Sequence, residues 1–346
     1  MLTRDTGFGS AVSATFVDMS TAPVVSGVAS EGRIWRIQCR DRELLARHGA
    51  PLIAGILNVT PDSFYDGGRH MTLDRARLHA DSLVDGGASI IDVGGASSRP
   101  QGAAYGAGAG LVSAEVERSR VLPVVAMLAR DVPEAVISVD TFRADIAEAC
   151  LDAGAHMIND ITALRFDPPL ARVVARHNAA IVLMHSVGLP GEMPHVSTYD
   201  DVLVTIRTEL SEAVARAVES GIPGIVTDPG FGFGKSTADN YRIVEGLEHQ
   251  RVDAYPIMVG VSRKNSIGVV LGEEGYPAPV HERLFGSLGV TAVAALRGAA
   301  IIRTHDVAAT SELLRTLSYT LSSARTAAQP ARQSATPPNL PEPDRD

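Results

Sequence analysis

One pattern repeats along most of this chain and limits the folds that it can adopt. A short apolar run is followed by a polar or glycine-rich loop, and then by a stretch with helical periodicity. The runs are mostly β-branched and apolar on both faces, as is typical of buried parallel strands. They lie at residues 52–57, 89–93, 135–139, 155–158, 180–184, 224–227, 256–261 and 299–302.

The number and order of these units predict the fold class. Eight β-then-α units in about 270 residues match an α/β fold of the closed (β/α)8 type, a single-domain TIM barrel. A doubly wound open sheet is the competing architecture, but no G-x-G-x-x-G follows the first run. Amphipathic stretches between the runs predict helices at 72–86, 113–130, 142–153, 198–220, 281–297 and 306–322.

The two ends of the chain differ from its middle. We expect a disordered N-terminal leader over 1–30, a hairpin over 31–50 that packs on the bottom of the barrel, the barrel itself over 51–322, and a disordered tail over 323–346. Asp5 and Asp18 interrupt the leader, which therefore does not resemble a secretory signal. The tail is rich in Pro, Gln and charge. No apolar run is long enough for a membrane helix, so we expect no membrane association.

Composition narrows the partners and the compartment. The formal net charge of −9 argues against nucleic acid as the main partner, because phosphate binding requires a basic face. Cys39 and Cys150 cannot form a disulfide framework and are typical of a reducing cytoplasm. Of the 31 basic residues only Lys235 and Lys264 are lysines, which makes both candidates for specific roles.

Polar residues stand at the carboxyl end of every predicted strand, where the reactive groups of a (β/α)8 barrel lie. Strand ends that meet solvent are often polar, and an Asp there can instead cap a helix. Because all eight ends carry such a residue, we expect these side chains to converge on one mouth. They are Asn58, Asp92, Asp140, Asn159, Asp160, His185, Asp228, Lys264, Arg303 and His305.

The candidates fall into two chemical sets, which predict a ligand with two different ends. Carboxylates accept hydrogen bonds from ring and amino N–H groups, and Asn both donates and accepts, so one set suits a flat, nitrogen-rich heterocycle. Arg binds phosphate oxygens through two N–H groups, so the other set suits an anion. The heterocycle set is Asp140, Asn159, Asp228 and Lys264, with Met184 and Phe233 as apolar faces; the anion set is Asn58, Arg99, Arg303 and His305.

Several other chemistries are disfavoured. The run at 228–236 resembles a phosphate loop, but Pro229 stands where that loop needs glycine, and Lys235 is instead expected to pin the loop or to face solvent. No Cys/His spacing suits zinc, and no nucleophile elbow is present. A metal, if used, is Mg²⁺ held by oxygen atoms such as that of Asn58 and by ligand phosphates.

Eight segments together resemble the dihydropteroate synthase family. They are 55–64 (GILNVTPDSF), 90–100 (IIDVGGASSRP), 138–141 (SVDT), 158–161 (INDI), 183–185 (LMH), 228–235 (DPGFGFGK), 261–264 (VSRK) and 303–306 (RTHD). They occur in the family's order across 51–322 and reach every predicted strand end.

The resemblance implies an enzyme of folate biosynthesis, a transferase. It would join 6-hydroxymethyl-7,8-dihydropterin diphosphate to 4-aminobenzoate and release diphosphate and 7,8-dihydropteroate. Its cofactor would be Mg²⁺. The protein would be a homodimer in the cytoplasm. Carried over by position, the pterin site is Asp140, Asn159, Ile161, Met184, Asp228, Phe233 and Lys264. The diphosphate site is Asn58, Asp66, Arg303 and His305, with Asn58 at the metal. The aminobenzoate site is Phe64, Ser98, Arg99, Pro100 and Asn265. The catalytic groups are Asp140, Lys264, Arg303 and His305.

The chain departs from the family pattern on one side of the site. Ala96 and Ser98 stand where the family usually has Glu and Thr, Asn265 stands where it has Ser, and the segment 101–112 is longer and richer in glycine. We therefore expect altered affinity for aminobenzoate or sulfonamides with the chemistry retained.

Three alternatives remain open. They are a pterin-dependent methyltransferase domain, a non-catalytic pterin-binding paralogue and a phosphosugar barrel enzyme. The methyltransferase domain would not need the loop at 60–64 or the anion set that includes Arg303. The non-catalytic paralogue would be expected to have lost Asn58, Arg99 or His305. The phosphosugar enzyme gives no reason for the heterocycle set.

Overall fold

The computed structural model describes residues 33–59, 68–96, 112–188 and 196–328. The chain divides into two units, Met1–Glu31 and Gly32–Asp346, and all the described residues belong to the second. Of the helices in the described ranges, none combines the length and the apolarity needed to span a bilayer.

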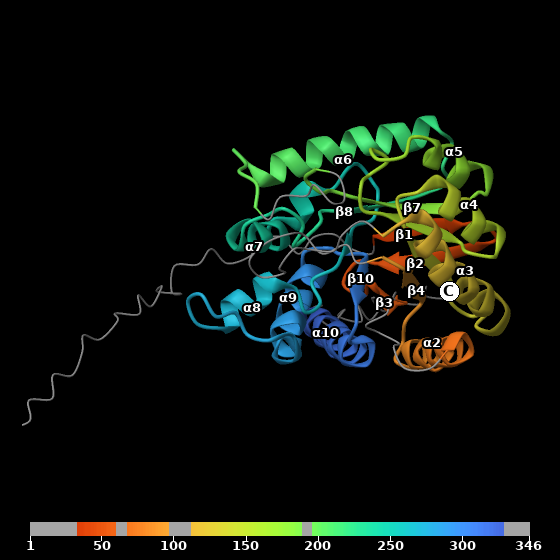
Figure 1. Cartoon of the computed structure of the whole chain (residues 1–346). Helices are drawn as coiled ribbons and strands as arrows, with labels where there is room; N and C mark the ends of the chain where they lie inside the picture. Colours follow the sequence, from red (N-terminus) through yellow and green to blue (C-terminus); the bar gives the residue numbers. More distant parts are fainter. Residues whose placement is uncertain (1–32, 60–67, 97–111, 189–195, 329–346) are drawn as a thin grey trace, which may run out of the picture. The chain divides into compact units, whose positions relative to one another are not determined.

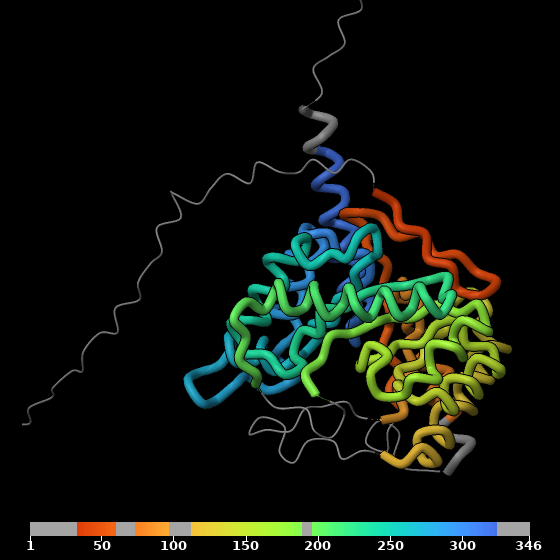
Figure 2. The backbone as a smooth tube through the Cα atoms, turned by 90° about the horizontal axis from the view of Figure 1, so that it is seen from above, coloured from red at the N-terminus to blue at the C-terminus, as the bar shows by residue number. Residues whose placement is uncertain are grey.

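Eight parallel strands of the described chain form a ring in which neighbours in sequence are neighbours in space (Figures 1 and 2). The last strand pairs with the first, and a bridge between Thr227 and Ile257 joins the two strands at the remaining gap. The predicted (β/α)8 barrel is therefore confirmed. The strands are β3 (Leu52–Asn58), β4 (Ile90–Gly94), β5 (Val136–Asp140), β6 (Met157–Asp160), β7 (Ala180–Met184), β8 (Gly224–Asp228), β9 (Met258–Val259) and β10 (Ile301–Thr304).

Helices follow the strands and surround them (Figure 1). They are α2 (Gly68–Asp85), α3 (Ala114–Asp131), α4 (Ala144–Asp152), α5 (Pro169–Arg176), α6 (Val202–Glu219), α7 (Thr237–Glu245), α8 (Asn265–Leu271), α9 (Leu284–Leu296) and α10 (Val307–Ala328), with short 3₁₀ turns at Leu247–Gln250 and Val280–Glu282.

The last helix corrects one predicted boundary. Helix α10 continues to Ala328, six residues past the predicted end of the barrel at 322. The added residues are Ser, Ala, Arg, Thr and two further Ala, among which Ala and Arg are strong helix formers.

A hairpin closes one end of the barrel. Strand β1 (Ile34–Cys39) pairs antiparallel with β2 (Arg42–Arg47), and alternate residues of β1 are buried. The buried face packs on inward residues near the amino ends of the barrel strands, which we call the floor. This cluster is Trp35, Ile37, Cys39, Leu44 and Ala46 against Ala54, Ile90, Val136, Met157, Ala180, Val182, Val226, Met258, Ala300 and Ile301. The predicted hairpin at the bottom of the barrel is confirmed.

The two-residue period of each strand separates a structural face from a functional one. Outward residues such as Ile91, Val139 and Ile181 belong to the main core that packs against the helices. Near the amino end of each strand, the inward side chain belongs to the floor. The next inward side chain along the strand lies two residues later. In this way Ile90 leads to Asp92, and in the other strands the floor residues lead to Ser138, Asn159, Met184, Asp228 and Arg303. The sequence period therefore places these side chains in one interior.

Candidate active site

An arginine held between two carboxylates forms the centre of the mouth. Arg303 Nε donates to Asp92 Oδ2 at 2.6 Å, and Arg303 Nη2 donates to Asp140 Oδ2 at 3.1 Å. Asp92 is only 2% exposed and also accepts from Ser138 Oγ at 2.6 Å and from Asn159 Nδ2 at 3.1 Å. Four strands are thus joined through one carboxylate, and Asn159 is oriented for a ligand.

The charges of this centre follow from burial and pairing. Burial alone would lower the pKa of Arg303, but Asp92 and Asp140 outweigh it, so the pKa is raised and the guanidinium stays charged. Burial raises the pKa of Asp140, and the Arg303 charge opposes that rise. Two of the five guanidinium N–H groups contact these carboxylates, and the others can reach an anion.

The second part of the mouth combines Asp228 with Lys264. Asp228 Oδ1 accepts from the Gly230 backbone N–H at 2.7 Å, which fixes the carboxylate. Lys264 Nζ donates to the Phe231 carbonyl and lies 4.3 Å from the centre of the Phe233 ring, where a cation is attracted to the ring face. Burial lowers the pKa of Lys264 to about 7, although Asp228 acts in the opposite direction.

An apolar cluster lies at the same end of the barrel. Ile161, Met184 and Phe142 are buried together, and Phe166 and Phe233 pack against them. The structure therefore brings together three of the predicted pterin-site residues, and adds Phe142, whose ring packs edge to face against Phe166 at 4.6 Å. Such flat apolar surfaces suit an aromatic ring.

His305 is oriented by a serine. Ser262 Oγ accepts from the His305 backbone N–H at 3.2 Å and lies 3.1 Å from His305 Nδ1. A buried hydroxyl is expected to donate its proton, and His305 Nδ1 is the acceptor that the described residues offer here. The remaining ring nitrogen, Nε2, then carries the proton and can donate to an anion. The His305 residue is exposed at the mouth, but desolvation on its protein side, followed by the charges of Arg303 and Arg263, lowers its pKa and favours the neutral ring.

An ion pair joins the loop after β9 to the loop after β10. Arg263 donates to both carboxylate oxygens of Asp306, with Nε to Oδ2 at 2.9 Å. The backbone of Arg263 is in the left-handed region, with φ at 56°. This contact and the Ser262–His305 contact join the segment after β9, which leads to Lys264, to the end of β10, which carries Arg303.

Gly94 leaves room for two oxygen atoms. A Cβ added at Gly94 would lie 3.3 Å from Asn58 Oδ1 and 3.9 Å from Asp140 Oδ2. Asn58 therefore lies at the same mouth as Asp140, as predicted. Within the described part of the chain, no three His, Cys, Asp or Glu side chains are grouped as a metal site.

Several predicted residues lie outside the described ranges. They are Phe64, Asp66, Ser98, Arg99 and Pro100. Asn265 is described and begins α8, directly after Lys264, and Ala96 is half-buried.

Two strand-end residues do not converge on the mouth, which corrects the expectation for them. His185 is 2% exposed, lines a separate cavity of about 400 Å³, and has Nε2 at 3.4 Å from Glu209 Oε2 on α6. Asp160 accepts from the backbone N–H and the hydroxyl of Thr162, both at 2.7 Å, and so closes the turn after β6. Each lies one position from an inward residue and therefore points outward.

Asp92 and Ser262 are the functional residues to which sequence reasoning assigned no role. Asp92 stands at a predicted strand end, and its place two positions after Ile90 is a usable signal for an inward side chain. Ser262 has the same relation to Gly260 and Met258, but β9 is only two residues long, so the period is difficult to read there.

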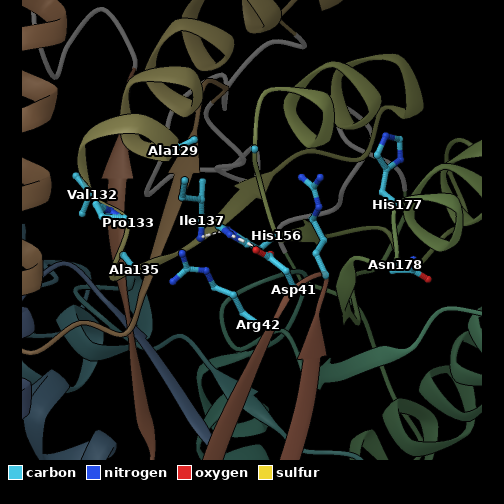
Figure 3. Close-up of a pocket in the computed structure, with 12 residues that line it drawn as sticks. Asp41, Arg42, Ala129, Val132, Pro133, Ala135, Ile137, His156, His177 and Asn178 are labelled. Carbon is cyan, nitrogen blue, oxygen red and sulfur yellow. Dashed lines mark hydrogen bonds and ion pairs between the residues drawn. The ribbon is translucent and has the colours of Figure 1, made fainter.

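A larger cavity lies at the other end of the barrel, beside the hairpin. It has a volume of about 620 Å³ and is lined by residues of the hairpin tip and of three loops (Figure 3). His156 points toward Asp41 there and its Nδ1 accepts from the Ile137 N–H at 3.1 Å, while Arg40 donates to the carbonyls of Leu151 and Ala155. These contacts join the hairpin to the barrel, so we regard the cavity as structural.

Comparisons with known proteins agree with this geometry. Residues 54–305 match the family model described as pterin binding enzyme. The dihydropteroate synthase of Escherichia coli K12 is 42% identical over 274 residues, which cover 79% of this chain and 92% of that protein. The dihydropteroate synthase of Bacillus subtilis is 42% identical over 260 residues, covering 74% of this chain and 84% of that protein.

Solved structures show the same relation. The structure of Xanthomonas albilineans dihydropteroate synthase with 4-aminobenzoic acid superposes with a TM-score of 0.73 at 39% identity, covering 86% of this chain and all of that one. The complex of the X. albilineans enzyme with 7,8-dihydropteroate gives a TM-score of 0.68 at 38% identity, covering 85% of this chain and 100% of that one. The chain therefore belongs to the dihydropteroate synthase family of pterin-binding enzymes.

Proposed function

We propose that this protein condenses 6-hydroxymethyl-7,8-dihydropterin diphosphate with 4-aminobenzoate to give 7,8-dihydropteroate and diphosphate. The observation that carries the proposal is the set of inward polar groups at one mouth, where a heterocycle-binding half adjoins a cationic half. The relatives named above carry the same activity in their names, and two of the solved structures hold 4-aminobenzoic acid or 7,8-dihydropteroate.

The pterin end is recognised by complementary hydrogen bonds. Asp228 and Asn159 are oriented by Gly230 and Asp92, and they can accept from amino and ring N–H groups of the pterin. Lys264 is a donor for a ring oxygen or nitrogen atom. The Phe142, Ile161 and Met184 cluster supplies the apolar face.

The reaction divides the remaining groups into two roles. The bond between the exocyclic methylene carbon and the diphosphate oxygen breaks, and its electron pair leaves with the diphosphate. Asp140 stabilises the positive charge left on the methylene and ring, while Arg303 and His305 donate to the departing anion. The amine nitrogen of 4-aminobenzoate then forms the new C–N bond and loses one proton. No covalent bond to the protein is required.

We propose Mg²⁺ as the cofactor. The Asn58 side chain is the described residue that would hold it, since Mg²⁺ prefers oxygen ligands and is commonly bound by a few protein groups together with substrate phosphates. When bound, the ion supplies charge stabilisation for the leaving diphosphate.

The aminobenzoate site is proposed from the family resemblance at Phe64, Ser98, Arg99, Pro100 and Asn265. Because the chain has Ala96, Ser98 and Asn265 at positions where the family differs, we propose altered affinity for aminobenzoate or sulfonamides. The inhibition constant of a sulfonamide for this protein is expected to differ from that for the triple variant Ala96→Glu, Ser98→Thr, Asn265→Ser. Equal constants would contradict this point.

We also propose a homodimer in the cytoplasm. Helices α8 and α9 and the segment between them carry exposed apolar side chains, and we propose that these form one interface, which we call the α8–α9 surface. Its exposed members are Val269, Val270, Leu271, Tyr276, Val280, Phe285, Val293 and Leu296. Apolar patches of this kind are typical of interfaces, and Gly289 on the same helix permits close approach. The free, buried thiols of Cys39 and Cys150 suit a reducing compartment.

The deciding experiment combines activity with two variants. Purified protein with both substrates and Mg²⁺ is expected to form 7,8-dihydropteroate, detected by mass spectrometry. Asp228→Asn is expected to weaken binding of the pterin without its diphosphate, whereas Arg303→Ala is expected to reduce the contribution of the diphosphate. Pterin binding without product would favour the non-catalytic alternative, and identical defects in both variants would contradict a site with two ends.

A further inference from the structure

The loop between β8 and α7 is wound unusually tightly. Gly230, Gly232 and Gly234 all have left-handed backbone, with φ of 70°, 81° and 67°. At Gly230 a Cβ would lie 1.9 Å from the His185 carbonyl oxygen, so the close approach of these two backbones requires glycine. The winding turns backbone carbonyls toward the inside of the loop.

The Lys235 ammonium occupies that inside position. Its Nζ donates to the carbonyls of Gly230 at 2.9 Å, Phe233 at 3.0 Å and His185 at 3.3 Å. An ammonium has three N–H donors, and three carbonyls accept them. The residue is 5% exposed, and its partners are carbonyl oxygens rather than carboxylates. Removal of the ammonium would therefore leave three inward carbonyls without this donor.

The same short loop carries groups of the pterin half of the site. Gly230 donates its backbone N–H to the Asp228 carboxylate, the Phe233 ring faces Lys264 Nζ, and the Phe231 carbonyl accepts from that ammonium. The carbonyls of Gly230 and Phe233 are the two that Lys235 binds within the loop. Lys235 therefore makes hydrogen bonds to Gly230, whose N–H orients the Asp228 carboxylate, and to Phe233, whose ring faces Lys264.

Asn240 on α7 also holds this loop, through contacts other than those of Lys235. Asn240 Oδ1 accepts from the Gly232 N–H at 2.6 Å, and Asn240 Nδ2 donates to the Lys235 carbonyl and to Ser266 Oγ. Asn240 binds the outer backbone and ties it to α7 and α8, whereas Lys235 holds the carbonyls on the inside. The Asn240 contacts do not reach the carbonyls of Gly230, Phe233 and His185, so holding these carbonyls is left to the Lys235 ammonium.

We propose that Lys235 is a positioning residue for pterin recognition, which holds the 230–234 loop in the shape that presents Asp228 and Phe233 to the pterin. The proposal rests on the proposed function. Lysine suits the position because its three N–H groups diverge from one point toward three carbonyls. The planar guanidinium of arginine cannot reproduce this arrangement.

The main test is Lys235→Met, which keeps an unbranched side chain as far as Cε and removes the ammonium with its donors. The KM for the pterin diphosphate is expected to rise about tenfold or more, since hydrogen bonds from a charged group are lost. The KM for 4-aminobenzoate, measured at saturating pterin diphosphate, is expected to stay within about threefold, because its predicted site lies elsewhere. Circular dichroism and thermal melting verify that the variant is folded.

The matched control is Arg40→Met. Arg40 also pins backbone carbonyls, those of Leu151 at 2.6 Å and Ala155 at 2.9 Å, but at the opposite end of the barrel. Both KM values are expected to be unchanged in this variant. If Lys235→Met does not fold, Lys235→Arg retains the charge without the geometry and is expected to show the same selective rise.

A folded Lys235 variant with unchanged pterin KM, or with equal rises in both KM values, would overturn the proposal. Calorimetric titration with the pterin diphosphate measures the same affinity without turnover. A wild-type protein that binds the pterin but forms no dihydropteroate would refute the proposed function alone, and the titration would still decide the role of Lys235.

Discussion

Asp92 connects more partners than any other carboxylate described at the mouth, since it accepts from Arg303, Ser138 and Asn159. Asp92→Asn keeps the shape and removes the charge. Breaking a buried ion pair in this way is expected to lower the free energy of unfolding by about 3 kcal/mol, measured by urea denaturation. The value of kcat/KM is expected to fall at least about tenfold, because Arg303 and Asn159 lose their fixed acceptor.

A surface pair provides the control for Asp92. Asp81 pairs with Arg77 on α2 at 2.8 Å, with side chains 41% and 38% exposed. Asp81→Asn is expected to change the free energy of unfolding by less than about 1 kcal/mol and to leave kcat/KM unchanged. Comparable losses in the two variants would show that Asp92 has no special role.

The two lysines provide a pH prediction. Burial lowers the pKa of both Lys235 and Lys264 from 10.5 to about 7, so the ammonium form of Lys235 that binds three carbonyls is the form present below about pH 7. Between these values the unfolded chain binds protons that the folded chain does not, so the free energy of unfolding is expected to rise as the pH increases from about 7 toward 10.5.

Nuclear magnetic resonance can check this directly, because a protein with ¹³C-labelled lysine contains only these two lysine side chains. Both signals are expected to titrate near pH 7, and Lys264→Met assigns them by removing one. Titration of both signals above pH 10 in the folded protein would contradict the role given to burial.

At the scale of elements, the hairpin stabilises the barrel without taking part in the chemistry. Trp35 on β1 is 4% exposed and packs on the floor. Trp35→Ala is expected to lower the free energy of unfolding by about 3–5 kcal/mol, measured by circular dichroism, with both KM values retained. Leu45 on β2 is 40% exposed, and Leu45→Ala is expected to cost no more than about 0.5 kcal/mol.

Because Trp35 is the single tryptophan, its fluorescence reports on the hairpin. In the unchanged protein, the fluorescence and circular dichroism transitions are expected to coincide if the hairpin and barrel unfold together. An earlier fluorescence transition would show that the hairpin detaches first and contributes less to the stability of the barrel.

The elements also explain how far sequence reasoning reaches. Short apolar runs identify all eight barrel strands, since burial on both faces leaves few other options. Helices α5, α7 and α8, which span only seven to nine residues, were not among the predicted stretches. Which of two neighbouring residues points inward depends on strand register, and an error of one position explains why Asp160 and His185 were expected at the mouth.

Register also limits prediction of the site. The identities of Asp140, Asn159, Asp228 and Arg303 follow from their places at strand ends. Their mutual contacts do not, because they depend on how strands far apart in sequence close the ring. The Arg303–Asp92 contact joins residues 211 positions apart, and no local pattern reports it.

The α8–α9 surface predicts how two copies of this chain would associate. Phe285 is 81% exposed, and a charge there would oppose burial in an interface. Phe285→Glu is expected to convert the proposed dimer to a monomer, measured by sedimentation velocity. Leu78→Glu on α2, where Leu78 is 69% exposed, is the control and is expected to leave the dimer intact. A monomeric wild-type protein, or a dimeric Phe285→Glu variant, would contradict the assignment.

The floor and the mouth occupy the same strands, two residues apart, and this has a consequence for directed evolution. A combinatorial library confined to floor positions such as Ile90 and Val136 would be screened mainly for solubility and heat tolerance. A library at Asp92 and Ser138, the next inward positions, would be screened for turnover and substrate range. The best members of the two libraries can then be recombined, because a single inward step along each strand separates positions that pack on the hairpin from positions that orient the groups of the mouth, although Asp92 also contributes to stability.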